Sequence, residues 1–343
     1  MNCYLQALLG LSLTMLLCSC TMTLPRAAET ENSAQIQALL YEGTPVDQRG
    51  GFKYETALIK ASRHGNLGIV MTLLKAGADI HARSKYGETA LIAATCFCHP
   101  NVVKFLLEHG AEVNVKDYSY GSTPLMLAVR CGDLTIVQAL ISQDAHVNEK
   151  CKMGMTALIL ASLEGHTEIV KLLLDAGATL EETWDKGGTA LSGAANRGHD
   201  AIVQTLIAKG ANINARLSNG WTPLMIAVAE GYTTTASILL ESGAEVNILN
   251  NKGRTALMFS VWYGNSEITE MLLKYGANPN IIPNDDEGMT ALMGATTKGY
   301  QEIVKMLLKS GADPNLKDKQ GKTAIARANK NIKKLLREAG AKD

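Results

Sequence analysis

Short apolar segments alternate with polar turns along most of the chain, and this alternation repeats at a nearly fixed interval. Segments that open with Thr, then Ala or Pro, then Leu or Ile start at residues 56, 89, 123, 156, 189, 222, 255, 290 and 323. The interval is 33 residues, apart from one of 34 and one of 35. Such a period is typical of stacked repeat proteins, in which no unit buries its apolar face alone and neighbours supply the core.

Each repeat has the pattern of two short helices joined by a tight corner. The opening Thr is a favourable N-cap, and Pro at the next position suits the first helical turn. A Gly nine residues after the Thr, such as Gly165, can adopt the left-handed conformation that a corner needs. The second helix, as in residues 169–174, carries apolar side chains at i, i+3 and i+4 and ends at another Gly, such as Gly177.

These residues resemble ankyrin repeats. The resemblance is carried by the Thr-Ala/Pro-Leu start, the pairs Gly165-His166 and Gly198-His199, the E-I-V-K-L-L-L helix at 168–174 and the G-A-x-x-N ending. It implies an all-α solenoid of helix-turn-helix units with β-hairpin-like tips, over residues 34–341, with about eight full repeats and partial capping repeats. One departure is that the family's T-P-L-H histidine is absent from every unit.

The N-terminus does not share the repeat. Residues 5–17 are almost wholly apolar, and this run is shorter than the ~20 residues that a membrane-spanning helix needs. It fits an export signal, and the following Leu-Cys-Ser-Cys resembles a bacterial lipobox, which implies a lipid on Cys20. We therefore expect a signal peptide at 1–20 and a short tether at 21–33. Thr21 favours the outer membrane over the inner one, while a periplasmic protein cut by an ordinary signal peptidase, or a mis-assigned start codon, stays open.

The segment A-T-C-F-C-H-P at 94–100 concentrates thiols and a histidine, as a metal site would. Aligned with the other repeats, His99 is the corner histidine and Cys98 occupies the corner glycine position. A zinc site needs about four ligands, and no second pair follows, so we expect no metal here. Stacked helices lie about 10 Å apart, whereas a disulfide needs Cα atoms within about 7 Å. We therefore expect Cys98 and Cys131 to stay unpaired without a shift, and expect the same of Cys96 and Cys151.

Composition narrows the function further. The chain has 33 basic and 33 acidic residues, which argues against a nucleic-acid partner, since those proteins carry a basic surplus. No nucleophile elbow, zinc-protease motif, P-loop or dinucleotide-binding glycine motif occurs. Each repeat touches only its neighbours, so distant polar groups do not converge on one pocket. We expect no enzyme activity and no cofactor.

Binding another protein is the remaining function. The family resemblance implies a concave face lined by the projecting tips and the adjacent end of each first helix. Aromatic side chains and arginine, which dominate interface energies, gather at these positions. The predicted partner-binding residues are Tyr86, Phe97, Tyr120, Arg130, Met153, Met155, Leu163, Arg197, Trp221, Glu230, Arg254, Trp262 and Tyr263.

We accordingly expect a monomeric scaffold or inhibitor in the bacterial envelope that contacts the membrane only through its lipid anchor. The alternative is a secreted effector that acts on host proteins.

Overall fold

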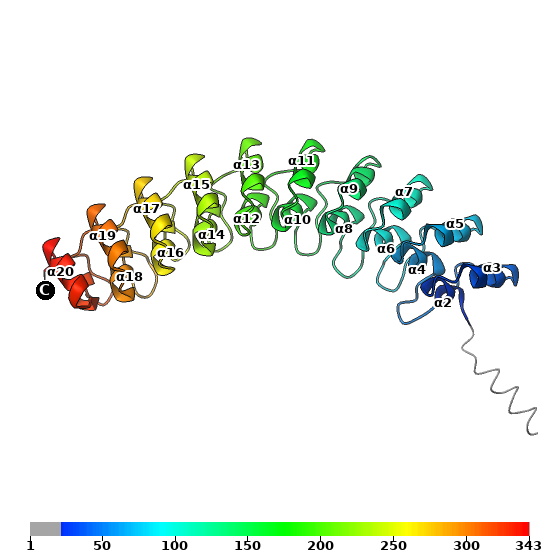
Figure 1. Ribbon diagram of the computed structural model, residues 1–343, viewed down its shortest axis with the longest axis horizontal. Coiled ribbons are helices and arrows are strands. Elements are labelled where there is room, and N and C mark those ends of the chain that lie inside the picture. The colour runs from blue at the N-terminus through cyan, green and yellow to red at the C-terminus, as the bar shows by residue number, and fades with distance from the viewer. Residues whose placement is uncertain (1–21, 343) are drawn as a thin grey trace, which may run out of the picture. The chain divides into compact units, whose positions relative to one another are not determined.

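The computed structural model describes residues 22–342 (Figure 1). These residues form short helices joined by loops, and they include no β-strand beyond one isolated antiparallel bridge between Gly50 and Glu55. They divide into two compact units, of which the first ends at His146 and the second begins at Val147. Within each unit the helix pairs are stacked in sequence order, which confirms the predicted all-α repeat fold.

Each helix pair consists of a first helix, which follows an opening threonine, and a second helix. In unit 1 the helices are α2 (Leu24–Glu29), α3 (Ser33–Tyr41), α4 (Ala57–Arg63), α5 (Leu67–Lys75), α6 (Ala90–Cys96), α7 (Pro100–Glu108), α8 (Pro124–Cys131) and α9 (Leu134–Ile141).

Unit 2 continues the same alternation and closes with a 3-10 helix followed by an amphipathic helix. Its elements are α10 (Ala157–Glu164), α11 (Thr167–Asp175), α12 (Ala190–Ala195), α13 (Asp200–Ala208), α14 (Pro223–Glu230), α15 (Thr233–Glu241), α16 (Ala256–Trp262), α17 (Ser266–Lys274), α18 (Ala291–Lys298), α19 (Gln301–Lys309), η1 (Ala324–Arg327) and α20 (Lys330–Glu338).

The repeat array begins earlier than the sequence indicated. Residues 24–33, which we expected to belong to a tether, instead form α2 and the start of α3. Leu24, Ala27 and Ala28 are fully buried, and α2 packs on α4 as each first helix packs on the next. Burial of this small apolar face explains why the segment is helical although it lacks the Thr-Ala-Leu start.

Threonine capping fixes where the first helices begin. The hydroxyl of Thr56 accepts a hydrogen bond from the N–H of Ile59 at 3.3 Å, and the other opening threonines cap their helices in the same way as far as Thr290. This confirms the predicted N-caps. Thr323 has no such bond, and only the short 3-10 helix η1 follows it.

The corner positions are left-handed, as predicted. Gly165 has φ 85°, and Cys98, which stands in a corner glycine position, has φ 61°; Asp144, which replaces the glycine after a second helix, has φ 58°. A residue with a Cβ is strained in this conformation, so the surrounding packing must hold it there.

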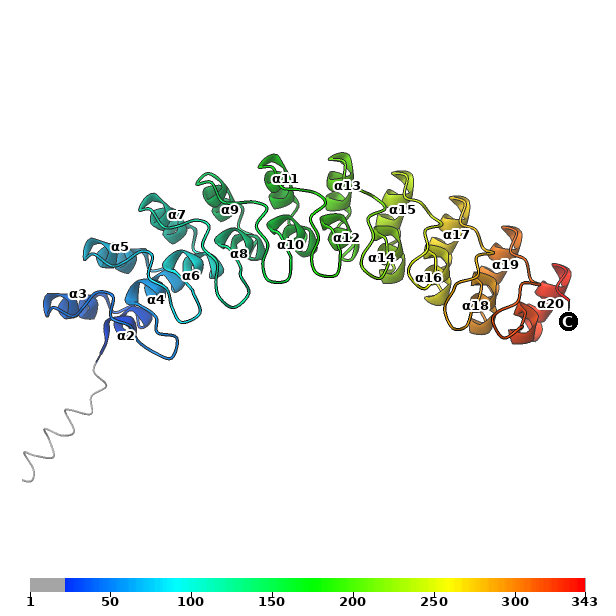
Figure 2. The same ribbon diagram turned by 180° about the vertical axis from the view of Figure 1, so that it is seen from behind.

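In each unit the first helices form one layer, and the second helices form another on the side away from the tips (Figures 1 and 2). The first helices are the more deeply buried: all of 90–95 in α6 is buried. In α11 only one stripe is buried, with Ile169, Val170 and Leu173 inside. The first helices therefore carry the core, and their C-terminal ends emerge beside the tips.

Backbone hydrogen bonds tie each tip to the next within a unit. The N–H of Lys85 donates to the carbonyl of Lys53 at 2.9 Å, and the N–H of Tyr118 donates to that of Tyr86 at 2.8 Å. Single tips close on themselves as well, as when the N–H of Ser84 donates to the carbonyl of Glu88. The tips are thus hairpin-like and hold their side chains in fixed positions.

Candidate functional site

The predicted binding residues lie on what we call the tip face of each unit. It comprises the loop residues one to five positions before each opening threonine and the residues seven and eight positions after it. None of the predicted residues is buried. Those that are exposed are Tyr86, Phe97, Tyr120, Arg130, Met153, Arg197, Glu230, Trp262 and Tyr263, and those that are half-buried are Met155, Leu163, Trp221 and Arg254.

In unit 1, Phe97 lies beside a cluster of charged residues. The guanidinium of Arg63 lies 5.8 Å from the centre of the Phe97 ring, which is cation–π distance. The same guanidinium forms ion pairs with both Glu55 and Glu88. Lys60 pairs with Glu55 at 3.5 Å. A buried ionic cluster therefore underlies the exposed ring.

The two carboxylates of this cluster have opposite pKa shifts. Burial opposes ionisation of Glu55, but the hydrogen bond and charge of Arg63 outweigh it and hold the pKa of Glu55 below its ordinary value. For Glu88, burial dominates and raises the pKa above the ordinary value, because Arg63 offsets it only in part and the charge of Glu55 adds to it. Arg63 thus stabilises the ionised form of Glu55 more strongly than that of Glu88.

Unit 2 has two pockets on its tip face. The first, which we call the Met153 pocket, has a volume of about 440 Å³. It brings together the predicted residues Met153, Met155 and Leu163, and Trp184 joins them from the next tip. Its wall is mainly apolar, so it can receive an apolar side chain.

The second, the Trp262 pocket, lies between α16 and α18 and has a volume of about 240 Å³. Trp262 and Arg254 are the predicted residues that line it. Two cations lie over the indole: the Arg254 guanidinium is 5.7 Å and the Lys298 ammonium 5.0 Å from the ring centre. The remaining lining includes Met258, Met289 and Pro283. A pocket this size is smaller than the ~300–1,000 Å³ of small-molecule sites, and it suits one large side chain.

An ion pair fixes the rim of the Trp262 pocket. Nε of Arg254 lies 2.7 Å from Oδ2 of Asp285. Burial opposes the charge on Asp285, but the N–H of Gly288 and the guanidinium of Arg254 outweigh it, so the pKa of Asp285 is lowered. Arg254 is therefore held in place by an ionised carboxylate while its other face lies on Trp262.

The other predicted residues of unit 2 are not gathered into these two pockets. The ring of Trp221 stacks on Phe259 of the next repeat, with 4.3 Å between ring centres, and so contributes partly to packing. Arg197, Glu230 and Tyr263 project from the ends of first helices and line neither pocket. They can contact a partner only as separate points on the surface.

Several tip residues with the same character were missed in the sequence. Trp184 and Tyr118 lie five positions before an opening threonine, one position outside the predicted set. Phe52 and Tyr54 lie on the tip before Thr56, where the first full repeat begins. Counting aromatic residues over the whole loop would identify Trp184, Tyr118 and Tyr54, whereas Phe52, four positions before Thr56, already occupies one of the predicted tip positions.

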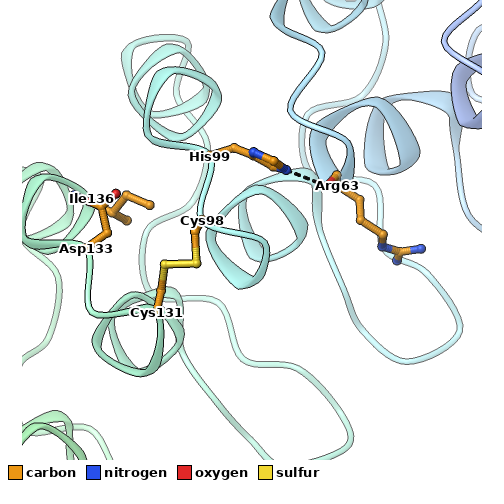
Figure 3. The surroundings of a disulfide bond; sticks show 6 residues. All are labelled: Arg63, Cys98, His99, Cys131, Asp133 and Ile136. Carbon is orange, nitrogen blue, oxygen red and sulfur yellow. Dashed lines mark hydrogen bonds between the residues drawn. A yellow bond between two sulfur atoms is a disulfide. The ribbon is translucent and has the colours of Figure 1, made fainter. Parts of the chain in front are cut away.

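The structure corrects the expected thiol state. Cys98 and Cys131 form a disulfide, with their Cα atoms 6.0 Å apart (Figure 3). The 10 Å spacing applies to helix axes, whereas Cys98 lies beyond the end of α6 in the left-handed corner, nearer to α8. On the side of the preceding repeat, the Nε2–H of His99 donates a hydrogen bond to the carbonyl oxygen of Arg63, 2.8 Å away. Cys96 and Cys151 form no disulfide within residues 22–342.

The part of the chain that the structure describes has neither a metal-binding cluster nor a membrane-spanning helix. Residues 22–342 contain no group of three or more His, Cys, Asp or Glu side chains placed to hold a metal ion. Among the same residues, no helix has both the length and the apolar character to cross a bilayer. The predicted signal peptide at 1–20 and the acylated Cys20 lie outside the described residues.

Comparison with known proteins agrees with this architecture. A family model described as ankyrin repeats (3 copies) matches residues 24–117, 118–183, 191–282, 243–318 and 283–342. These segments cover nearly all of the described chain, and the first one begins at the start of α2.

Individual relatives match shorter stretches. An ankyrin repeat-containing protein of Treponema pallidum is 35% identical over 92 residues, which is 27% of this chain and 30% of that protein. The palmitoyltransferase ZDHHC13 of Danio rerio is 34% identical over 110 residues, or 32% and 17% of the two chains. The RelA-associated inhibitor of Mus musculus is 37% identical over 90 residues, or 26% and 11%. The matches thus span less than a third of each relative's length.

Proposed function

The chain belongs to the ankyrin-repeat family, and from this premise we propose that it holds another protein on the tip face of unit 2. Ankyrin repeats generally mediate binding to other proteins. The observation that carries the proposal is the Trp262 pocket, where an aromatic floor and an arginine fixed by an ion pair lie together on an exposed face. Binding energy in protein interfaces concentrates in such aromatic and arginine anchors.

The fixed geometry of the tips supports this role. Neighbouring tips in unit 2 are joined by backbone hydrogen bonds, such as that from the N–H of Ser218 to the carbonyl of Lys186 at 2.9 Å. A partner therefore meets side chains that are already ordered, and it does not have to offset the entropy of ordering them. The Met153 pocket would receive a second apolar side chain of the same partner.

We further propose that the protein is exported and anchored in the bacterial envelope by a lipid on Cys20. The apolar run at 5–17 and the Leu-Cys-Ser-Cys segment support this location. There the protein would act as a scaffold or as an inhibitor that covers a functional surface of its partner. One relative, from mouse, is named as an inhibitor, which supports the second form.

The alternative is a secreted effector that binds a host protein through the same tip face. The two proposals differ in where the protein is found, so cell fractionation separates them. Recovery in the membrane fraction supports the anchored form. Recovery in the culture medium, with none in the membrane fraction, supports the effector.

Affinity capture tests the binding proposal itself. The full chain is used to capture proteins from an envelope extract, and captured proteins are identified by mass spectrometry. A matched bait carries Tyr275→Ala, because Tyr275 is 40% exposed but lies beyond α17 in the second-helix layer. We expect the same partner with both baits, and its loss when Trp262 is replaced by Ala. A partner retained equally by all three baits would contradict the assignment to the tip face.

A further inference from the structure

The tip face of unit 1 differs from that of unit 2 in carrying exposed aromatic rings on successive tips. We call this group the aromatic strip; its members are Phe52, Tyr54, Tyr86, Tyr118 and Tyr120. Phe52 is 77% exposed, and Tyr54, Tyr118 and Tyr120 are each more than half exposed. Exposure of so many large rings leaves apolar surface in water and indicates an interaction site.

The three tips that carry the strip are tied to one another. The backbone bonds from Lys85 to Lys53 and from Tyr118 to Tyr86 join the three tips that carry it. The Tyr118 ring lies against Gly87, so close that a Cβ built on this glycine would stand 2.6 Å from the ring. The rings are thus positioned by neighbouring backbone and do not hang from independent loops.

Positive charge accompanies the rings. Lys53 and Lys85 are exposed, and the ammonium of Lys85 lies 4.8 Å from the centre of the Phe52 ring and 6.0 Å from that of Tyr86. The nearby carboxylates point elsewhere: Glu55 and Glu88 pair with Arg63. The surface that the strip presents is therefore aromatic and cationic.

The acidic residue on the third tip is also engaged with its own loop. The Asp117 carboxylate accepts hydrogen bonds from the N–H groups of Tyr120 and Ser122, at 2.7 and 2.8 Å. At the far end of these loops, Glu112 lies 3.7 Å from Arg83. These contacts leave the two lysines as the exposed charges among the rings of the first two tips.

The described chain begins next to this strip. A Cβ built on Gly50 would lie 3.1 Å from Cβ of Pro25 and 3.6 Å from the Thr23 hydroxyl, so the start of α2 lies against the base of the first tip. Cys20 precedes Thr23 by three residues, which span at most about 11 Å. A lipid on Cys20 would therefore bring the first tip close to a bilayer; this step, unlike the composition of the strip, rests on the proposed anchoring.

We propose that the aromatic strip lies on the surface of an anionic lipid bilayer, with Phe52 entering furthest. Aromatic rings of amphipathic character favour the headgroup region, and lysines beside them are attracted to anionic headgroups. A protein partner is the weaker assignment for this strip, because the strip lies beside the start of α2, where the proposed lipid on Cys20 would hold it next to a bilayer. The protein thus touches the membrane with a folded surface as well as through its lipid.

A tryptophan at position 52 tests this orientation. Phe52→Trp and Tyr41→Trp are made in the full chain, and quenching by brominated lipid is measured on vesicles with and without phosphatidylglycerol. Tyr41 is the matched control, since it is 94% exposed in the same unit but lies at the end of α3 in the other layer. The N-terminal segment and the native tryptophans are common to both chains, so any difference in quenching reports the position of the added tryptophan. We expect added quenching for Phe52→Trp alone.

A second set of variants tests the contribution of the two lysines. Adding Lys53→Glu and Lys85→Glu to the Phe52→Trp chain should abolish the added quenching on anionic vesicles, with the helical circular dichroism unchanged. Vesicle-bound protein in which positions 52 and 41 are quenched alike would overturn the proposal. So would shielding of position 52 by the captured partner and not by lipid. Neither result affects partner capture by unit 2, so the two proposals fail separately.

Discussion

The imidazole of His99 covers the corner glycine of the preceding repeat, Gly65, and its Nε2 lies 2.8 Å from the carbonyl oxygen of Arg63. A Cβ built on Gly65 would stand 2.5 Å from Nδ1 of the ring. Two features therefore require glycine at position 65: its φ of 74° and the His99 ring that covers it. Where the next repeat has Asp133 in place of a ring, the preceding corner accepts Cys98.

Replacing Gly65 by Ala should therefore destabilise unit 1 more than replacing Gly77. Both glycines are left-handed, and each Ala carries about 1–2 kcal/mol of conformational strain. At Gly77 the added methyl meets open space, whereas at Gly65 it displaces His99 and should add about 1–3 kcal/mol. Urea unfolding of the two variants measures the difference. Equal midpoints would show that the His99 contact is unimportant.

The disulfide between Cys98 and Cys131 should stabilise unit 1. It links residues 33 positions apart, and closing a loop of this length is worth up to about 3–4 kcal/mol in the unfolded chain. Cys131→Ser should lower the thermal midpoint of the oxidised protein and make it insensitive to dithiothreitol. Cys151→Ser serves as the control, because Cys151 is not bridged. A midpoint that dithiothreitol leaves unchanged in the parent protein would contradict the bridge.

The Arg63 cluster predicts opposite pH dependences for two variants. The lowered pKa of Glu55 contributes stability above its ordinary value of 4.5, and this contribution is lost as the pH falls through the folded-state pKa. Glu55→Gln should therefore cost about 1–3 kcal/mol at pH 7, and the deficit should shrink below pH 4.5.

The pH dependence expected for Glu88→Gln is opposite to that for Glu55→Gln. The raised pKa of Glu88 means that the folded protein holds the proton more tightly, so its contribution is present below pH 4.5 and is lost as the pH rises through the folded-state pKa. The deficit of Glu88→Gln relative to the parent should grow as the pH falls through that range. Parallel trends in the two variants, measured by urea unfolding at several pH values, would refute the assignment.

Loss of the proposed lipid on Cys20 should change where the protein is found in the cell. Cys20→Ala should move the protein out of the membrane fraction of the native host, because each buried CH₂ of the lost acyl chains contributes about 0.8 kcal/mol of membrane affinity. Metabolic labelling with a fatty-acid analogue should mark the parent protein and not the variant. An unlabelled parent protein would rule out acylation.

Much of the fold could be read from regularly spaced residues. Thr56 and its equivalents cap helices, and Gly165 and its equivalents turn corners, because each depends on local backbone chemistry that its neighbours in sequence determine. Helix α2 was missed since its burial against α4 comes from tertiary packing, and since Thr23, which caps it, is followed by Leu-Pro and not by Ala or Pro and then Leu. The disulfide was missed for a related reason: Cys98 lies in a left-handed corner beyond the end of α6, where its Cα is only 6.0 Å from that of Cys131.

The candidate site could be predicted less fully. Exposure at the tips follows from the repeat, so the predicted residues all lie at the surface. Which of them share a pocket does not follow, because the Trp262 pocket depends on side chains such as Met258 and Pro283 that have no place in the surface pattern. Trp184 and Tyr118 were missed because they lie five positions before an opening threonine, outside the tip positions that the repeat pattern singled out.

The central claim is that a partner protein binds the tip face of unit 2, and titration calorimetry of the captured partner tests it most directly. The chain with Trp262→Ala, Tyr263→Ala and Arg197→Ala is compared with Tyr275→Ala and with the parent protein. We predict that the triple variant weakens the Kd by about 30-fold or more, the equivalent of ~2 kcal/mol for an interface anchor, with a nearly unchanged thermal midpoint. An unchanged Kd in the triple variant, or a large fall in its thermal midpoint, would contradict the claim.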